Sequence, residues 1–175
     1  MRVSYGSQEV QVSAGEFVSN LLRAISIAPD VAALQWPMRK ACRAGLDKRV
    51  AELTISAVAA QCRNPQVWSG HAPRLVSRGL SPDQIRGLRD GDLTSLDEAD
   101  RALVTLAQAV ETCTVTDERW DAASLFLSPH ALAHVVLLAS YYAMLCRIQF
   151  AYDVPLDEGL VGMAYPDAEN TLAGV

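Results

Sequence analysis

The sequence predicts an all-α protein, a single-domain bundle of about seven or eight helices. Apolar residues recur with a helical period along most of the chain from Ala14 onwards. Capping residues, prolines and glycines divide this pattern into segments of ordinary helix length. The only strand-like alternation is weak and confined to the first twelve residues. Half of the 175 residues are hydrophobic but only 6% are aromatic, which is typical of a helical globular protein with one core.

Four helices are predicted in the first half of the chain. The first, over residues 14–26, is indicated by periodicity alone, and the second, over 29–43, begins at Pro29 and is stopped by Gly45. The third, over 47–62, is capped by Asp47. The fourth, over 64–79, begins with the cap Asn64 and Pro65 and ends at Gly79. Pro37 lies inside the second of these helices. Because proline removes a backbone donor and crowds the preceding turn, we expect it to kink or divide that helix.

Four more helices are predicted in the second half. They are bounded, in order, by "SPDQ" and Gly91 for residues 81–91, by "SLDE" for 95–113, by the cap Thr116 for a short helix, and by Ser128 and Pro129 for 128–152. The last is the most apolar, but His134 and Arg147 leave its uninterrupted apolar part shorter than the roughly 20 residues of a membrane span. We expect it to be a buried central helix. Residues 1–13 are interpreted as an arm or short strand, and 156–175 as a tail.

Charge and cysteine content exclude several classes of protein. The formal net charge of -5 disfavours a nucleic-acid partner, which requires a concentrated basic surface. The first fifteen residues have no long apolar run and do not resemble a signal peptide, so we expect a cytoplasmic protein without a membrane partner. The four cysteines form no CxxC pair, so neither a metal site nor a disulfide framework is expected.

The stretch "VWSGHAPR" contains the first candidate functional residue, His71. Trp68 lies one helical turn before it, on the same face. Pro73 deprives the Ser69 carbonyl of its usual donor, and Gly70 lets the backbone bend. A freed carbonyl needs another partner, which indicates a cavity beside the histidine. The alternative is that His71 is a partly buried histidine bonded to a neighbour, with Trp68 in the core.

Glu52 is the second candidate. It lies on the preceding helix beside apolar residues, and a tight turn would bring it toward His71. A carboxylate beside an imidazole fixes its tautomer and raises its basicity, as in a base with an orienting partner. The alternative places Glu52 on the surface, paired with Lys48 or Arg49.

Three segments carry a family resemblance: "KRVAELTISAVAAQCRNPQVWSGH" (48–71), "RGLSPDQIRGLRDGDLTSLDEADRALVTLAQAV" (78–110) and "ALAHVVLLASYYAMLCRIQFAYDVPLDEG" (131–159). In this order they resemble the carboxymuconolactone decarboxylase family, which has the alkylhydroperoxidase-D-like helical fold. Similar features are an early glutamate, a W-x-x-H, a "GLS" helix and a long apolar helix ending in "DVPL". The resemblance implies one such domain, with its best match over residues 47–159.

The active-site motifs of this family are only partly present. The peroxidase branch has C-x-x-C-x-x-x-H with a relay glutamate, and here the two thiol positions are Asn64 and Val67. Cys62 alone cannot replace a dithiol, because the mixed-disulfide step needs a resolving thiol. The decarboxylase branch often has E-W-x-x-H, whose glutamate position is also Val67, and sometimes a second histidine, where this chain has Gly70.

The resemblance implies a cofactor-independent enzyme that performs acid–base chemistry on a small organic molecule: decarboxylation, isomerisation or lactone chemistry. In this interpretation His71 is the acid or base and Glu52 orients it. Trp68 forms a pocket wall, and Arg74 or Arg147 pairs with a substrate carboxylate. For both arginines the alternative, a solvated helix residue, is favoured. The alternatives are a non-catalytic small-molecule-binding or assembly homologue and, third, a thiol peroxidase.

Assembly is the last expectation. The helix over 129–152 is apolar on more than one stripe, so some apolar surface should remain for a partner. Members of the family commonly form homo-oligomers. We therefore expect a cyclic homo-oligomer, a trimer or hexamer, with this helix near an interface and the two terminal segments as candidates to wrap a neighbour.

Overall fold

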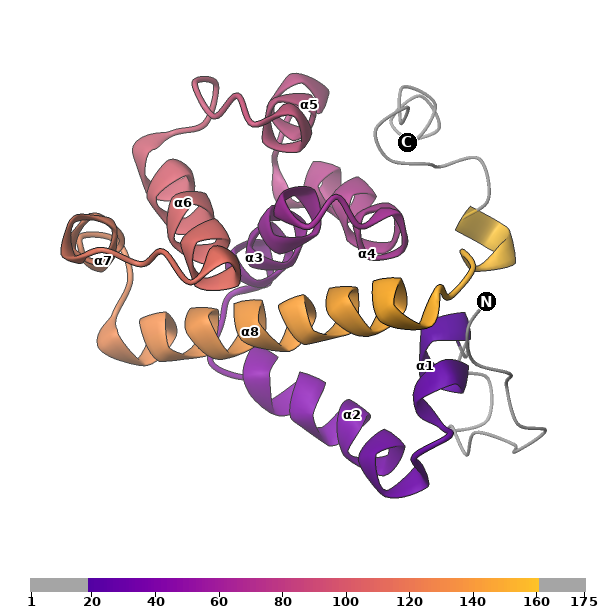
Figure 1. The fold of residues 1–175 in the computed structure, drawn as a ribbon. Helices are drawn as coiled ribbons and strands as arrows, with labels where there is room; N and C mark the ends of the chain where they lie inside the picture. The colour runs from indigo at the N-terminus through magenta and orange to yellow at the C-terminus, as the bar shows by residue number, and fades with distance from the viewer. Residues whose placement is uncertain (1–18, 161–175) are drawn as a thin grey trace.

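A computed structural model describes residues 19–160 of the chain as a helical fold (Figure 1). This range contains eight α-helices, two 3-10 helices and no strand, which confirms the all-α fold class. The α-helices are α1 Asn20–Ile25, α2 Pro29–Arg43, α3 Lys48–Gln61, α4 Pro65–His71, α5 Pro82–Asp90, α6 Glu98–Thr112, α7 Asp117–Ser124 and α8 Pro129–Tyr152. The 3-10 helices are η1 Ala72–Arg78 and η2 Glu158–Leu160.

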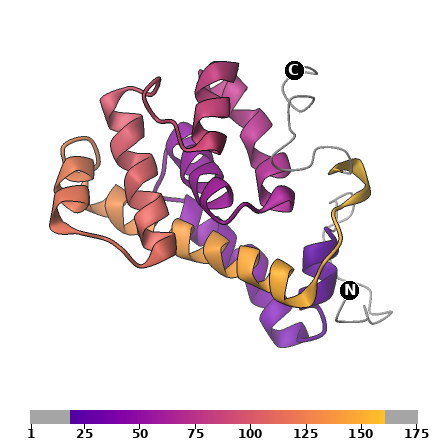
Figure 2. The same cartoon turned by 45° about the horizontal axis from the view of Figure 1, so that its top comes forward.

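The core is organised around α3 and α8. Helix α3 lies between α4 and α6 and packs on α8 (Figure 2), while α2 lies on the opposite side of α8 (Figure 1). Ten consecutive residues of α3, 51–60, are buried. A helix that is buried around its whole circumference needs small and apolar side chains, and the alanines and valines of "AELTISAVAA" meet that need. A polar residue in this helix, Glu52, is therefore buried.

Most of the predicted helix boundaries are confirmed by the capping contacts. Asn64 Oδ1 accepts a hydrogen bond from the Val67 N–H at 2.9 Å, and Ser81 forms the predicted capping box. The "SLDE" prediction is wrong in detail, because Asp97 rather than Ser95 caps α6. Of the predicted first helix, residues 14–18 lie outside the described range.

Pro37 does not divide α2, which runs as one helix from Pro29 to Arg43. By contrast, the expected interruption beside His71 is confirmed. The α-helix ends at His71, whose φ of -125° and ψ of -42° leave the helical region, and the chain continues as η1. Pro73 lies in the first turn of η1, where its missing N–H costs nothing. The helix type therefore changes at the histidine itself.

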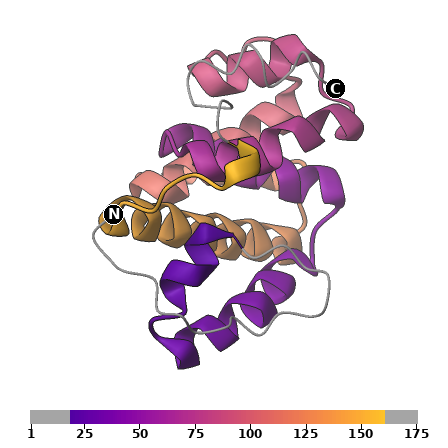
Figure 3. The ribbon, with the colours of Figure 1, turned by 90° about the vertical axis from the view of Figure 1, so that its right-hand side faces the viewer.

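The end of the described chain folds back onto the bundle. The Asn20 N–H donates to Asp157 Oδ1 at 2.6 Å, so α1 and the segment before η2 lie side by side (Figure 3). Gln66 of α4 also bonds to the Asp157 side chain and accepts from its N–H at 2.9 Å. Residues 156–160, predicted to belong to a tail, thus form part of the fold, because Asp157 is buried and bonded on both sides.

Helix α8 is long and apolar enough to cross a membrane, but half of its most apolar window is buried inside the bundle, as expected of a central helix. Two large apolar side chains inside it, Leu137 and Phe150, are about half exposed. A longer exposed stripe lies before and on α2, where the side chains repeat at intervals of four, three and four residues. The members of the stripe are Ile27, Val31, Leu34 and Met38.

Candidate functional site

A cavity of about 400 Å³ opens between α1, α2, α4, α8 and the last described residues. Its wall is mainly apolar. The apolar side chains that line it include Leu21, Leu22, Val67, Tyr141, Leu145 and Leu160. Polar atoms enter at a few places only, as in most small-molecule sites. His71 is among these polar groups, together with Arg39, Arg74 and Tyr142.

Glu52 and His71 form the expected pair at the wall of this cavity. His71 Nδ1 lies 2.7 Å from Glu52 Oε2. Both side chains are at least nine-tenths buried. The pair joins the start of α3 to the end of α4, which the tight turn between them holds close. The alternative placement of Glu52 on the surface is therefore wrong, and Arg49 pairs instead with Asp100.

The second carboxylate oxygen of Glu52 faces arginines. Arg43 Nη2 donates to Oε1 at 2.7 Å, and Arg74 Nη1 lies 3.8 Å from the same atom. Burial alone would raise the pKa of Glu52, but the hydrogen bonds of His71 and Arg43 outweigh it, together with the charge of Arg43 and that of His71 at the acidic pH where the imidazole is protonated. They lower this pKa to about 2. Glu52 is thus an ionised carboxylate at neutral pH.

His71 is held as a neutral imidazole. Burial lowers its pKa; Glu52 opposes this effect, and the charges of Arg74 and Arg39 add to it. Since the carboxylate only accepts hydrogen bonds, Nδ1 carries the proton and Nε2 has a free lone pair. A neutral imidazole with an available lone pair can accept a proton.

A tyrosine and an arginine extend this arrangement on the cavity side. Tyr142 Oη lies 3.3 Å from His71 Nε2, within reach to donate to it. Arg39 Nε donates to Tyr142 Oη at 3.0 Å, and the Arg39 guanidinium lies over the Trp36 ring. Proton donors and acceptors therefore run from Arg39 through Tyr142 and His71 to Glu52.

The other predicted site residues divide into one that lines the cavity and two that do not. Arg74 lines it, with its side chain half exposed. Trp68 is buried in the core and is not part of the cavity wall, so the expected wall role is corrected. The expectation that Arg147 binds a substrate carboxylate is also wrong. Arg147 donates to the Glu111 carbonyl at 2.9 Å and pairs with the Glu111 carboxylate, away from the cavity.

Three residues of the site were missed in the sequence. Arg39 and Arg43 lie one turn apart on α2, a spacing that places them on one face. That spacing is the signal that a sequence analysis can use, but it does not reveal which side of α2 faces the site. Tyr142 lies in the apolar run of α8 and resembles a core residue, and no sequence signal distinguishes its hydroxyl from that of Tyr141.

The cysteines also differ from expectation. Cys62 is not alone, because its thiol and that of Cys146 on α8 are hydrogen-bonded to each other. This bond, followed by burial, raises the pKa of Cys146, which disfavours a thiolate there. All four cysteines are free thiols. Within residues 19–160, no group of three or more His, Cys, Asp or Glu side chains is placed to hold a metal ion.

No protein-family model matches the sequence, and a search of curated proteins finds no match. The fold is similar to that of the debrominase Bmp8, both in its apo form and in a complex with 2,3,4-tribromopyrrole. In each case the TM-score is 0.71 with 14% identity, over 83% of this chain and 81% of Bmp8.

A second solved structure with this fold is the core of alkylhydroperoxidase AhpD, an uncharacterized peroxidase-related protein from Ralstonia eutropha JMP134. The TM-score is 0.71 with 16% identity, over 86% of this chain and 82% of that one. The chain therefore has the alkylhydroperoxidase-D-like fold, as its resemblance to the carboxymuconolactone decarboxylase family implies. At sequence identities of 14% and 16%, these similarities show the fold alone, and the activity has to be argued from the site.

Proposed function

We propose that the protein is a cofactor-independent enzyme that moves a proton at a carbon atom of a small organic molecule, with His71 as the acid–base group. The observation that carries this proposal is the buried imidazole at the cavity wall, whose Nδ1 lies 2.7 Å from Glu52 Oε2 and whose Nε2 faces Tyr142, another lining residue. A positioned base of this kind typically accelerates a proton transfer by about 100- to 10,000-fold.

The reaction step follows from the hydrogen bonds. A substrate that displaces the Tyr142 hydroxyl from Nε2 brings an acidic C–H to that lone pair. The proton moves to Nε2, and the electron pair of the broken C–H bond passes to the adjacent carbonyl group, which becomes an enolate. Glu52 stabilises the imidazolium that forms, and Tyr142 and Arg39 supply hydrogen-bond donors to the enolate oxygen. Return of the proton from Nε2 to a different carbon completes an isomerisation.

Charge in the cavity favours an anionic substrate. The charges of Arg74 and Arg39 contribute to the low pKa of His71. A substrate carboxylate paired with Arg74 offsets that effect, so His71 becomes a stronger base when the substrate is bound. Decarboxylation and lactone opening use the same two elements, a proton at carbon and a stabilised enolate.

Thiol chemistry is less well supported. Asn64 and Val67 occupy the two thiol positions of the peroxidase branch. Cys62 does have a neighbouring thiol, but the raised pKa of Cys146 keeps that partner protonated. A non-catalytic binding protein would have no need for a base held in one tautomer, and the buried pair of Glu52 and His71 therefore favours the enzyme.

The proposal is tested by deuterium exchange. Small cyclic unsaturated carboxylates and lactones are incubated with the protein in D2O, and incorporation at carbon is followed by NMR. We expect one member of this set to exchange, and His71→Gln to abolish the exchange while the matched control His130→Gln leaves it unchanged. Exchange that persists in His71→Gln would contradict the proposal. Saturable binding in the cavity without any exchange would favour the non-catalytic homologue.

A further inference from the structure

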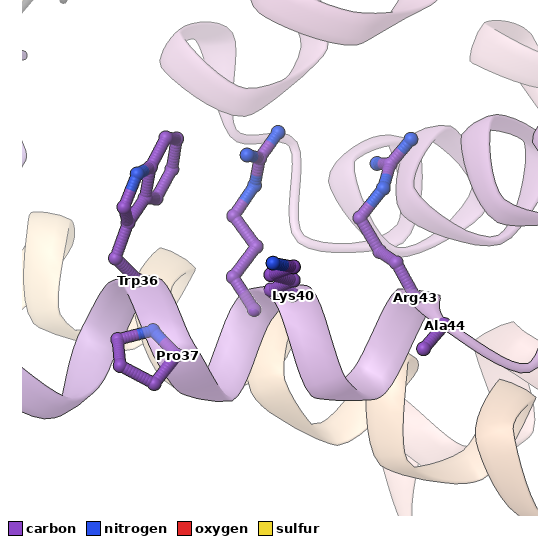
Figure 4. A pocket seen from close by; sticks show the side chains of 6 residues that line it. Trp36, Pro37, Lys40, Arg43 and Ala44 are labelled. Atoms are coloured by element: carbon purple, nitrogen blue, oxygen red, sulfur yellow. The ribbon is translucent and has the colours of Figure 1, made fainter.

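A second hollow lies beside the cavity, along α2. It has a volume of about 720 Å³, and the described residues that line it all belong to α2 or follow it: Trp36, Pro37, Arg39, Lys40, Arg43 and Ala44. Trp36 and Arg43 project from the same side of the helix, with Lys40 between them along the chain (Figure 4). The spacing of these residues explains this, since side chains three and four positions apart share a face.

The hollow has three cations and little to balance them. Of the described carboxylates, only that of Glu52 pairs with any of the three, through Arg43. The Nη1 of Arg43 is buried and has no hydrogen-bond partner. Lys40 has no ion pair with any residue in the described part of the chain. This concentration of positive charge occurs in a chain whose formal net charge is -5.

Neither Arg39 nor Lys40 forms an ion pair with a described carboxylate, so their charges favour a ligand that supplies anionic acceptors to the hollow. Arginine and lysine together suit a group with several terminal oxygens. A phosphate dianion has three such oxygens and is bound by just these donor types. Because Glu52 already pairs with Arg43, a ligand with a single carboxylate would leave either Arg39 or Lys40 unpaired.

The two hollows are neighbours, because Trp36 and Arg39 line both. A ligand of modest length can therefore place an apolar body in the cavity of His71 and a charged group along α2. Both linings are mainly apolar, and the second hollow adds three cationic side chains, those of Arg39, Lys40 and Arg43.

We propose that the hollow along α2 is a binding site for a dianionic group of the phosphate class, carried by an organic molecule whose apolar part occupies the cavity of His71. Only one element of this inference rests on the proposed function, namely that the part of the ligand that reacts lies beside His71. The binding of the dianion is a separate property, and it is measured without any turnover.

The test compares phenyl phosphate, benzoate and inorganic phosphate by isothermal titration calorimetry at pH 8, where the phosphates are dianions. We expect phenyl phosphate to bind at least tenfold more tightly than either of the other two. Lys40→Ala should remove most of this advantage, because it removes one of the cations that bind the dianion. Lys40 contacts neither Glu52 nor His71, so the variant leaves that pair intact. Lys48→Ala is the matched control: it removes the same charge from an exposed lysine on α3 and should leave all three affinities unchanged.

Equal affinities for phenyl phosphate and benzoate, or an advantage that survives Lys40→Ala, would overturn the site. Inorganic phosphate binding as tightly as phenyl phosphate would overturn the organic part of the inference, since the hollow would then take the free ion. The same titrations on His71→Gln separate this inference from the proposed function. Retained binding of phenyl phosphate by that variant supports the α2 site even if no proton exchange is found.

Discussion

Replacing Glu52 by glutamine tests the buried pair through its contribution to folding. The pKa of this carboxyl falls from its ordinary 4.5 to about 2 in the folded protein. Since one pKa unit corresponds to 1.36 kcal/mol, the ionised carboxylate stabilises the fold by about 3 kcal/mol at neutral pH. Loss of one charge from a buried ion pair costs a similar amount, because Arg43 is left without its counter-charge.

The assay is urea unfolding at pH 7 and one fixed protein concentration. We expect Glu52→Gln to lower the free energy of unfolding by about 3 kcal/mol. Glu111→Gln is the control: it removes a carboxylate paired with the exposed Arg147 and should cost less than about 1 kcal/mol. A loss below about 1 kcal/mol for Glu52→Gln would refute the reasoning, since the carboxylate would then gain nothing from its partners.

The pH dependence has a definite sign. The folded pKa of Glu52 lies below the unfolded value, so the stabilisation is complete above about pH 4.5 and is lost as the pH falls toward 2. The cost of Glu52→Gln should therefore shrink as the pH falls from 4.5 toward 2, because a protonated carboxyl no longer gains from His71 and Arg43. A cost that is constant down to pH 3 would contradict this assignment.

The remaining predictions concern activity, backbone space, redox chemistry and assembly. Tyr142→Phe should slow deuterium exchange by about 100-fold or more while the protein stays folded, because it removes one hydrogen-bond donor from the enolate; an unchanged rate would exclude that role. Gly70→Ala points into open space and should raise stability by about 0.5–1 kcal/mol, whereas Gly87→Ala places a methyl group against the Asp92 carbonyl oxygen and should destabilise by about 1–3 kcal/mol in the same unfolding assay. No organic hydroperoxide should be turned over with a dithiol reductant; turnover that is lost on Cys62→Ser would show this to be wrong. Light scattering at micromolar concentration should show a trimer or hexamer, and a stable 18.9 kDa monomer would contradict that expectation.

Local sequence signals predicted the helices well and long-range contacts less so. Asn64 and Ser81 cap their helices as expected, because a cap involves only the next three residues. Pro37 did not divide α2, since one proline removes a single hydrogen bond that the packing of α2 on α8 outweighs. The contact of Glu52 with His71 was predictable because a tight turn joins their helices.

The rest of the site depends on how α2 and α8 meet, which no short sequence pattern encodes. Arg39 and Tyr142 are 103 residues apart in the chain and become neighbours only through that packing. The same reason explains why Arg147 was wrongly expected in the cavity: it lies on the α8 face that meets Glu111 of α6. Whether an arginine side chain lies beside the cavity is decided by the packing of helices that are distant in sequence, and its sequence neighbours do not indicate it.

The central claim is that His71 is a neutral base, with its proton on Nδ1 and its lone pair on Nε2. Nitrogen-15 NMR of the histidine side chains at pH 7 measures this directly, and the spectrum of His71→Gln assigns the signal among the three histidines. The structure predicts the neutral tautomer protonated on Nδ1, with a pKa below the usual 6.5 because the ring is buried. An imidazolium at pH 7, or a neutral ring protonated on Nε2, would contradict the account.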